Sequence, residues 1–136
     1  MTGAPPFALV IDTNRVLDLW LFDDPAVDTV RAQICGGQAR WLATAAMRAE
    51  LAEVLNYPGL VRQLQRRGRA ADAVLAAFDR WARPADPAPP APVRCRDGDD
   101  QIFVDLAVHW RATLLSKDHE VCVLAPRLAP LGVVVC

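Results

Sequence analysis

A run of five apolar residues that ends in three polar ones constrains the fold of this chain more than any other feature. Residues 7–11 read Phe-Ala-Leu-Val-Ile, and Asp12, Thr13 and Asn14 follow directly. A continuous apolar run of this length is typical of a strand buried on both faces of a parallel sheet. Open parallel sheets carry their sites at the carboxyl ends of their strands. The sequence therefore predicts an α/β fold with Asp12 at a functional edge.

The rest of the chain alternates predicted helices with short predicted strands. The spacing of apolar residues predicts helices over residues 16–22, 25–34, 45–55, 60–67, 70–81 and 99–111. Further strands are predicted over residues 41–44, 113–116 and 133–135. This order favours one domain, residues 1–136, folded as a three-layer α/β/α sandwich around a mostly parallel sheet.

Proline, glycine and aspartate mark the expected boundaries of these elements. Asp24 is a candidate cap for the helix that begins at Pro25, and Pro58 is expected to end the helix before it. Gly68 separates two further helices. Residues 84–93 hold five of the eleven prolines, which indicates an extended connector inside the domain.

The composition excludes several classes of protein. Apolar residues make up 53% of the chain and charged residues 23%, which is enough apolar material for a core and excludes a mainly disordered chain. The formal net charge of −1 gives no overall field that would attract nucleic acid or an anionic membrane. Thirteen of the 16 acids are aspartate, a residue that favours loops, caps and metal sites over helix interiors.

The four cysteines show no zinc-binding spacing, and no early apolar stretch has the length and basic lead of a signal peptide. No stretch approaches the ~18 apolar residues of a membrane span. We therefore expect a cytoplasmic protein with reduced thiols and no membrane partner.

Carboxylates from four separate segments are predicted to converge. Asp12 and Asp118 each follow a predicted strand, Glu50 lies in the helix after the second strand, and Asp99 and Asp100 begin another helix. Such a cluster repels itself and raises the pKa values of its members unless a cation neutralises it. Oxygen ligands of this kind suit Mg²⁺ or Mn²⁺. Each acid also has a purely structural alternative as a helix cap, a turn residue or a solvated surface group.

Four segments carry a resemblance to a known family. They are residues 10–14 (VIDTN), 49–55 (AELAEVL), 96–107 (RDGDDQIFVDLA) and 114–118 (LLSKD). In this order they resemble PIN domains, in particular the toxin components of bacterial toxin–antitoxin systems. The resemblance covers nearly the whole chain.

The resemblance implies a Mg²⁺- or Mn²⁺-dependent ribonuclease with RNA as its substrate, an antitoxin protein as its partner and a homodimer as its assembly. The positions that match the four catalytic and metal-binding acids of the family are Asp12, Glu50, Asp100 and Asp118. Asp99 is an additional candidate ligand, and Asp97 is a further acid of the same loop.

The chain departs from the family pattern at two positions. Gly98 stands where proline is common, and Arg111 stands where glycine is common. We expect a more flexible loop at the first position and a less sharply capped helix end at the second. Neither departure removes a candidate ligand.

Substrate contacts are expected from polar and basic side chains. Asn14 and Ser116 lie beside the predicted acids and could orient phosphate or water. Arg66 and Arg67 belong to the densest cationic run of the chain, which spans residues 62–69, and arginine suits bidentate contact with phosphate. A solvated helix face explains the same run equally well.

The tryptophans are expected in the core or at an interface, at positions 20, 41, 81 and 110. Residues 20–22 (Trp-Leu-Phe) form an apolar cluster that could dock an antitoxin or a second protomer.

Three other functions fit parts of the pattern. A receiver domain would need an aspartate at the end of a central strand, but residues 41–44 end in Ala-Thr. A phosphatase of the haloacid dehalogenase type would need Asp-x-Asp-x-Thr where this chain has Asp-Thr-Asn. A PIN-like module that binds RNA or protein without turnover remains the alternative, and binding of Mn²⁺ at the acidic edge would distinguish it from an enzyme.

Overall fold

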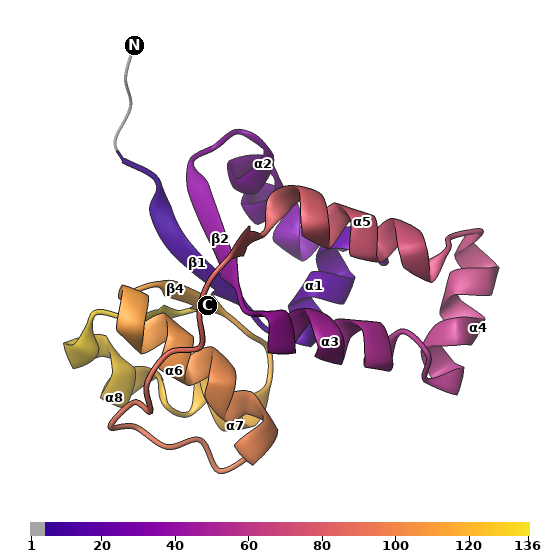
Figure 1. The fold of residues 1–136 in the computed structure, drawn as a ribbon. Coiled ribbons are helices and arrows are strands. Elements are labelled where there is room, and N and C mark those ends of the chain that lie inside the picture. Colours follow the sequence, from indigo (N-terminus) through magenta and orange to yellow (C-terminus); the bar gives the residue numbers. More distant parts are fainter. Residues whose placement is uncertain (1–4) are drawn as a thin grey trace.

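The computed structural model describes residues 5–136 and contains one five-stranded sheet (Figure 1). Its strands are β1 (Phe7–Ile11), β2 (Ala39–Ala43), β3 (Arg83–Pro84), β4 (Thr113–Leu115) and β5 (Val134–Val135). They lie in the order β3-β2-β1-β4-β5, and each pair of neighbours is parallel. The long predicted strand is therefore the centre of the sheet.

β1 takes the central position because it is the most apolar strand. Leu9, Val10 and Ile11 are all buried, as expected for a strand covered on both faces. The register pairs Ile11 with Leu115 of β4, so these two strands end side by side. The residues that follow β1 and β4 are thereby brought together.

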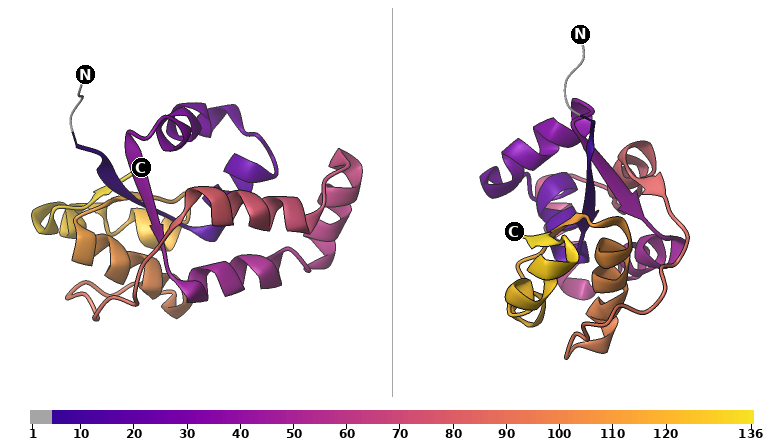
Figure 2. Two further views of the ribbon diagram at one scale, coloured as in Figure 1. Left: turned by 45° about the horizontal axis from the view of Figure 1, so that its top comes forward. Right: turned by 90° about the vertical axis from the view of Figure 1, so that its left-hand side faces the viewer.

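Helices cover both faces of the sheet. The α-helices are α1 (Thr13–Trp20), α2 (Asp28–Cys35), α3 (Ala45–Val54), α4 (Pro58–Arg67), α5 (Ala71–Trp81), α6 (Gln101–Trp110), α7 (His119–Cys122) and α8 (Ala125–Leu128). Three short 3₁₀ turns accompany them: η1 (Pro25–Val27), η2 (Gly98–Asp100) and η3 (Ala129–Leu131). The sheet lies between α2 on one side and α6 on the other (Figure 2). The predicted three-layer α/β/α sandwich is confirmed.

Helices α3, α4 and α5 form an arm that extends away from the sheet (Figures 1 and 2). Arg48 of α3 donates two hydrogen bonds to Asp79 of α5, at 2.7 and 2.8 Å, and so fastens the two long sides of the arm. Gly68 ends α4 with φ 63°, a left-handed conformation that glycine adopts without strain. α4 lies at the outer end of this arm, on the opposite side of the molecule from α6.

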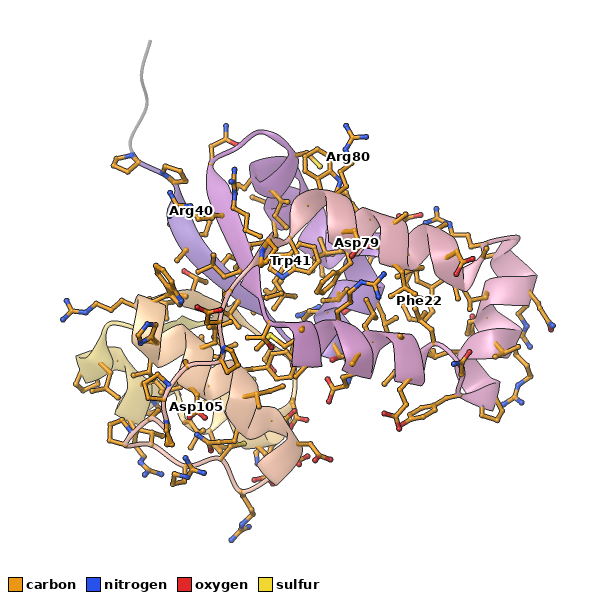
Figure 3. The ribbon with its side chains drawn as sticks, viewed as in Figure 1. Phe22, Arg40, Trp41, Asp79, Arg80 and Asp105 are labelled. Carbon is orange, nitrogen blue, oxygen red and sulfur yellow. The ribbon has the colours of Figure 1, made fainter. Side chains whose placement is uncertain are left out.

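The core is built around Trp41, which is fully buried (Figure 3). Its ring stacks on Trp20 at 6.4 Å and meets Phe78 of α5 edge-on at 5.0 Å. Leu21 is fully buried beside them and Phe22 is half-buried, so residues 20–22 contribute to the core rather than to an exposed apolar patch. Trp110 differs from the other tryptophans because its side chain is exposed.

Proline chemistry explains two differences from the predicted helices. The expected helix 25–34 is divided into η1 and α2, with Asp24 accepting the backbone N–H of Ala26 at 2.9 Å. Pro58 does not end a helix but begins α4, where its fixed φ and missing N–H are tolerated.

Two further elements fall where no regular structure was predicted. The start of the proline-rich connector forms β3, which pairs with Leu42 and Ala43 of β2. The short helices α7 and α8 occupy part of the segment after β4. A strand of two residues and helices of four are too short to show a hydrophobic period.

The expectation of a poorly capped end for α6 is wrong. Arg111 adopts a left-handed conformation with φ 49°, and its backbone N–H still bonds to Val108. The next residue, Ala112, donates to Ala107 at 2.9 Å. The arginine stem packs on Gly132, which leaves no room there for a Cβ atom without adjustment.

Within residues 5–136, no helix combines the length and the apolar character that crossing a bilayer requires. The four cysteines are all unpaired.

Candidate active site

Asp12 directly follows β1 and is buried. Its backbone N–H donates to Leu115 at the end of β4, at 3.0 Å, which continues the pairing of the two strands. Its carboxylate oxygen Oδ1 accepts the backbone N–H of Arg15 at 3.1 Å and thereby caps α1. The capping role is therefore real, but it occupies only one of the two carboxylate oxygens.

Ser116 connects Asp12 to Asp118. The buried Ser116 hydroxyl donates to Oδ2 of Asp12 and accepts the backbone N–H of Asp118 at 3.1 Å. Asp118 in turn accepts the backbone N–H of Glu120 at 2.8 Å and caps α7. Ser116 therefore fixes the positions of two predicted catalytic acids, one from each central strand.

The turn before α6 brings Asp97 and Asp100 to the same edge of the sheet, close to Asp118. One carboxylate oxygen from each of Asp97, Asp100 and Asp118 lies within 4.8 Å of the other two. We call these three residues the acidic cluster. Asp97 also accepts the backbone N–H of Asp99 at 3.0 Å, which shapes the turn. Asp99 itself is exposed and is not part of the cluster.

The electrostatics of the acidic cluster are unfavourable when no cation is bound. Burial, as the largest cause, and the neighbouring carboxylates of Asp118, Asp97 and Asp12, in that order, together raise the pKa of Asp100 to about 7. Burial also raises the pKa of Asp12, although the bonds from Ser116 and Arg15 oppose this shift. A nearby positive charge would lower both pKa values.

The donor set of the acidic cluster fits a hard divalent cation. All its side-chain donors are carboxylate oxygens, the ligands preferred by Mg²⁺ and Mn²⁺. Oδ2 of Asp100 is buried and has no hydrogen-bond partner among the described residues. A buried, unpartnered carboxylate oxygen is costly, and coordination to a cation would satisfy it.

Glu50 reaches the same edge from α3. Thr44 caps that helix by accepting the backbone N–H of Met47 at 3.3 Å. One turn further on, the Glu50 carboxylate accepts a hydrogen bond from the hydroxyl of Thr13, the residue next to Asp12. All four predicted acids therefore approach the carboxyl edge of β1 and β4, whereas Asn14 is exposed on α1.

An ion-pair network around the buried Asp18 lies beside these acids. It was not predicted from the sequence. Asp18 of α1 is buried, accepts a hydrogen bond from Arg15 at 3.1 Å and forms an ion pair with Lys117 at 2.8 Å. Because Lys117 precedes Asp118, this network fastens α1 to the turn that carries one member of the acidic cluster. Arg15 and Asp18 have helical spacing, but Lys117 is distant in sequence.

Gln101 is a second positioning residue that the sequence did not reveal. Its buried side chain accepts the backbone N–H of Cys95 at 2.5 Å and donates to Asp105 at 2.7 Å. Asp105 also accepts the backbone N–H of Ala91 at 2.9 Å, and it faces the connector that precedes α6 (Figure 3). These bonds hold the connector against α6 immediately beside Asp100.

The arginines of residues 62–69 divide into two groups. Arg67 donates to the backbone carbonyl of Phe22 at 3.3 Å, and its guanidinium lies 5.0 Å above the Phe22 ring. Arg69 donates to the carbonyl of Trp20 at 3.0 Å and pairs with Asp23. Arg66 is exposed and has no hydrogen-bond or ion-pair partner among the described residues.

The fold and the carboxylates together define an α/β protein with an acidic edge suited to a divalent cation. A family model described as PIN domain matches residues 8–120, and the chain belongs to the PIN domain family. Proteins of this family are generally nucleases and typically bind divalent metal ions. A comparison with curated proteins finds no match.

Proposed function

We propose that this chain is a Mg²⁺- or Mn²⁺-dependent endoribonuclease that hydrolyses phosphodiester bonds in single-stranded RNA. The observation that carries the proposal is the acidic cluster, which lies beside Asp12 near the carboxyl ends of β1 and β4 in a chain of the PIN domain family. No other group of side chains in the described residues gathers three metal-ligating residues in this way.

Asp97, Asp100 and Asp118 would hold the cation, with Asp12 beside them. When bound, the cation would neutralise phosphate charge and lower the pKa of a coordinated water. The chain's own residues keep the ligands in place, because Ser116 fixes Asp12 and Asp118 while Gln101 holds the segment around Asp100. Glu50, held by Thr13, would orient water or a second ion from the α3 side.

We also propose that the chain is the toxin of a toxin–antitoxin pair, with a cognate antitoxin and a homodimeric assembly. The four sequence segments that resemble such toxins support this part of the proposal. The rival is a PIN domain that binds RNA or protein without turnover, and a measurement of cleavage separates the two directly.

Cleavage of a fluorescently labelled single-stranded RNA by the purified chain tests the enzymatic proposal. We expect cleavage with Mn²⁺ or Mg²⁺ and none in excess EDTA. Asp118→Asn should abolish cleavage, while Glu53→Gln, an exposed acid on α3, serves as the control. RNA binding without cleavage at any metal concentration would establish the binding module instead, and equal cleavage in EDTA would contradict the role of the cation.

A further inference from the structure

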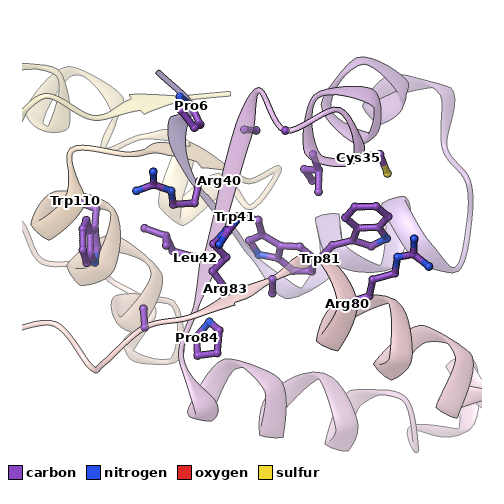
Figure 4. A pocket seen from close by; sticks show the side chains of 15 residues that line it. Pro6, Cys35, Arg40, Trp41, Leu42, Arg80, Trp81, Arg83, Pro84 and Trp110 are labelled. Atoms are coloured by element: carbon purple, nitrogen blue, oxygen red, sulfur yellow. The ribbon is translucent and has the colours of Figure 1, made fainter. Parts of the chain in front are cut away.

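A basic pocket lies on the opposite edge of the sheet from β4 and β5, away from the acidic cluster. It has a volume of about 850 Å³ and passes over the edge of β2 beside β3 (Figure 4). Arg40, Arg80 and Arg83 contribute the charged side chains of its lining, which includes no aspartate or glutamate. We call this pocket the arginine groove.

The arginine groove exists because the edge of β2 is only partly covered. β3 pairs with Leu42 and Ala43, so residues 39–41 of β2 have a strand neighbour only on the β1 side. Side chains of a strand alternate between its two faces, which places Arg40 and Trp41 on opposite faces of the sheet. The groove therefore follows a strand edge without a further strand partner, from which the Arg40 side chain is exposed.

The three cations of the groove have no partner of opposite charge among residues 5–136. The side chains of Arg40 and Arg83 make no hydrogen bond or ion pair there, and the Arg80 guanidinium lies 4.7 Å above the ring of Trp81. All three side chains are exposed. This contrasts with Arg67 and Arg69, which the fold uses to fasten the arm.

Two tryptophans flank these cations. Trp110 lies on the α6 side of β2 and Trp81 on the α5 side, with Arg40 and Arg83 between them (Figure 4). Trp110 is 46% exposed, an unusual position for so large an apolar side chain. Arginines that contact phosphates and aromatic rings that stack on bases are the two components of sites for single-stranded nucleic acid.

We propose that the arginine groove binds single-stranded RNA as a second contact site, separate from the acidic cluster. The proposal takes its ligand from the proposed ribonuclease function but uses none of the candidate catalytic residues. Three unpaired cations without an acid provide charge complementarity to phosphates, and the rings provide stacking surfaces. An acidic peptide added to the β2 edge would satisfy the cations but would leave the rings without a stacking partner, so RNA fits the groove better.

Binding of a fluorescein-labelled oligouridylate to the full chain, measured by fluorescence anisotropy in EDTA, tests this proposal. The chelator prevents metal-dependent cleavage, so the experiment reports binding alone. We expect Arg40→Glu with Arg83→Glu to weaken binding by at least about tenfold and to lower the slope of log affinity against log salt by about one for each lost phosphate contact. Arg127→Glu, at an exposed arginine of α8 outside the groove, is matched in charge to Arg40→Glu alone and should weaken RNA binding less than that single groove variant does.

The stacking component is tested at Trp110, whose exposure makes its replacement compatible with folding. Trp110→Ala should weaken binding by about fivefold or more, and Trp110→Phe should retain most of the affinity because the ring is kept. Tyr57→Ala is the aromatic control, since Tyr57 is 50% exposed but lies outside the groove.

Unchanged RNA affinity in both groove variants would overturn the proposal, even if the chain cleaves RNA with Mn²⁺. Tight binding of a poly-glutamate peptide that the groove variants lose, with no effect of these variants on RNA, would also overturn it and assign the groove to a protein partner. Conversely, groove-dependent RNA binding without any cleavage would support the groove while contradicting the proposed enzyme.

Discussion

The chain contains two kinds of acidic region, which lie close together and differ in what neutralises them. Asp18 is buried but forms ion pairs with two cations, Arg15 and Lys117. The acidic cluster has three carboxylates within 4.8 Å and no cation paired with any of them among the described residues. The fold supplies counter-charges where an acid has only a structural role. It leaves the cluster uncompensated, which is expected where a ligand from solution completes the site.

The largest expected effect separates two neighbouring acids of the same turn. Asp100→Asn should lower metal-dependent RNA cleavage by about a hundredfold or more, because it removes a charge from the centre of the acidic cluster. Asp99→Asn should change cleavage by less than about threefold, since Asp99 is exposed and lies outside the cluster. Initial rates at saturating Mn²⁺ measure both. Equal losses in the two variants would show that the cluster is wrongly defined and that Asp99 is also a ligand.

Replacing Asp18, the acid with two cationic partners, should affect stability rather than cleavage. Asp18→Asn leaves Arg15 and Lys117 without their carboxylate, and we expect it to lower the free energy of unfolding by about 2 kcal/mol, reduced from the value for fully buried pairs because Lys117 is partly exposed. Asp28→Asn is the matched control. Asp28 pairs with Arg31 at the same i,i+3 spacing, but its side chain is 63% exposed against 5% for Asp18.

Urea denaturation in EDTA measures both changes, and the Asp28 variant should lose less than about 0.5 kcal/mol. A loss of similar size in the two variants would mean that burial of Asp18 adds nothing to its pairs.

The pH dependence of stability should reveal the uncompensated charges directly. Asp100 has a pKa of about 7 in the folded chain and an ordinary value of 3.8 when exposed, so the folded chain binds more protons between these values. The metal-free chain should therefore lose stability as the pH rises from about 4 to about 7. We expect a loss of about 1 kcal/mol. This is well below the limit of about 4 kcal/mol that ~1.4 kcal/mol per pKa unit gives over about three units, because solvent screens the partly exposed carboxylate.

Thermal unfolding in EDTA across this pH range measures the effect, and Asp100→Asn should remove it. Added Mn²⁺ should stabilise the chain more at pH 8 than at pH 5, because coordination requires deprotonated carboxylates. A parent chain whose stability rises between pH 4 and 7 without metal would contradict the electrostatic description of the cluster.

Features that depend on a local sequence pattern could be predicted, whereas those that depend on backbone geometry could not. The central strand, the parallel sheet and the positions of Asp12 and Asp118 follow from apolar runs with polar residues after them. Glu50 and Asp100 were assigned from their places on predicted helices and from the resemblance to PIN domains. Asp97 rather than Asp99 joins the cluster because of the conformation of one turn, in which Asp97 also accepts the backbone N–H of Asp99. That choice depends on backbone geometry, which residue types alone do not specify.

Contacts between residues that are distant in the sequence could not be predicted either. Lys117 reaches Asp18 across 99 positions, and the arginine groove gathers residues from β2, α5, β3 and α6. Neither arrangement produces a periodic signal along the chain. The arginines of residues 62–69 are dense enough in the sequence to indicate a basic surface, but the sequence does not reveal that Arg67 and Arg69 also fasten the arm.

The smallest expected effect extends the comparison from acids to these arginines. Arg67→Glu removes a hydrogen bond and a stacking contact with Phe22, so it should lower the free energy of unfolding by about 1 kcal/mol. Arg66→Glu removes no such contact and should leave stability within about 0.5 kcal/mol of the parent chain. If α4 contacts RNA as the sequence predicts, Arg66→Glu should weaken binding by about twofold to threefold and flatten its salt dependence slightly. Urea denaturation and RNA titration of the two single variants separate these roles, which a double substitution would merge.

An Arg66→Glu chain whose RNA affinity depends on salt as in the parent chain would assign Arg66 to the solvated face of α4.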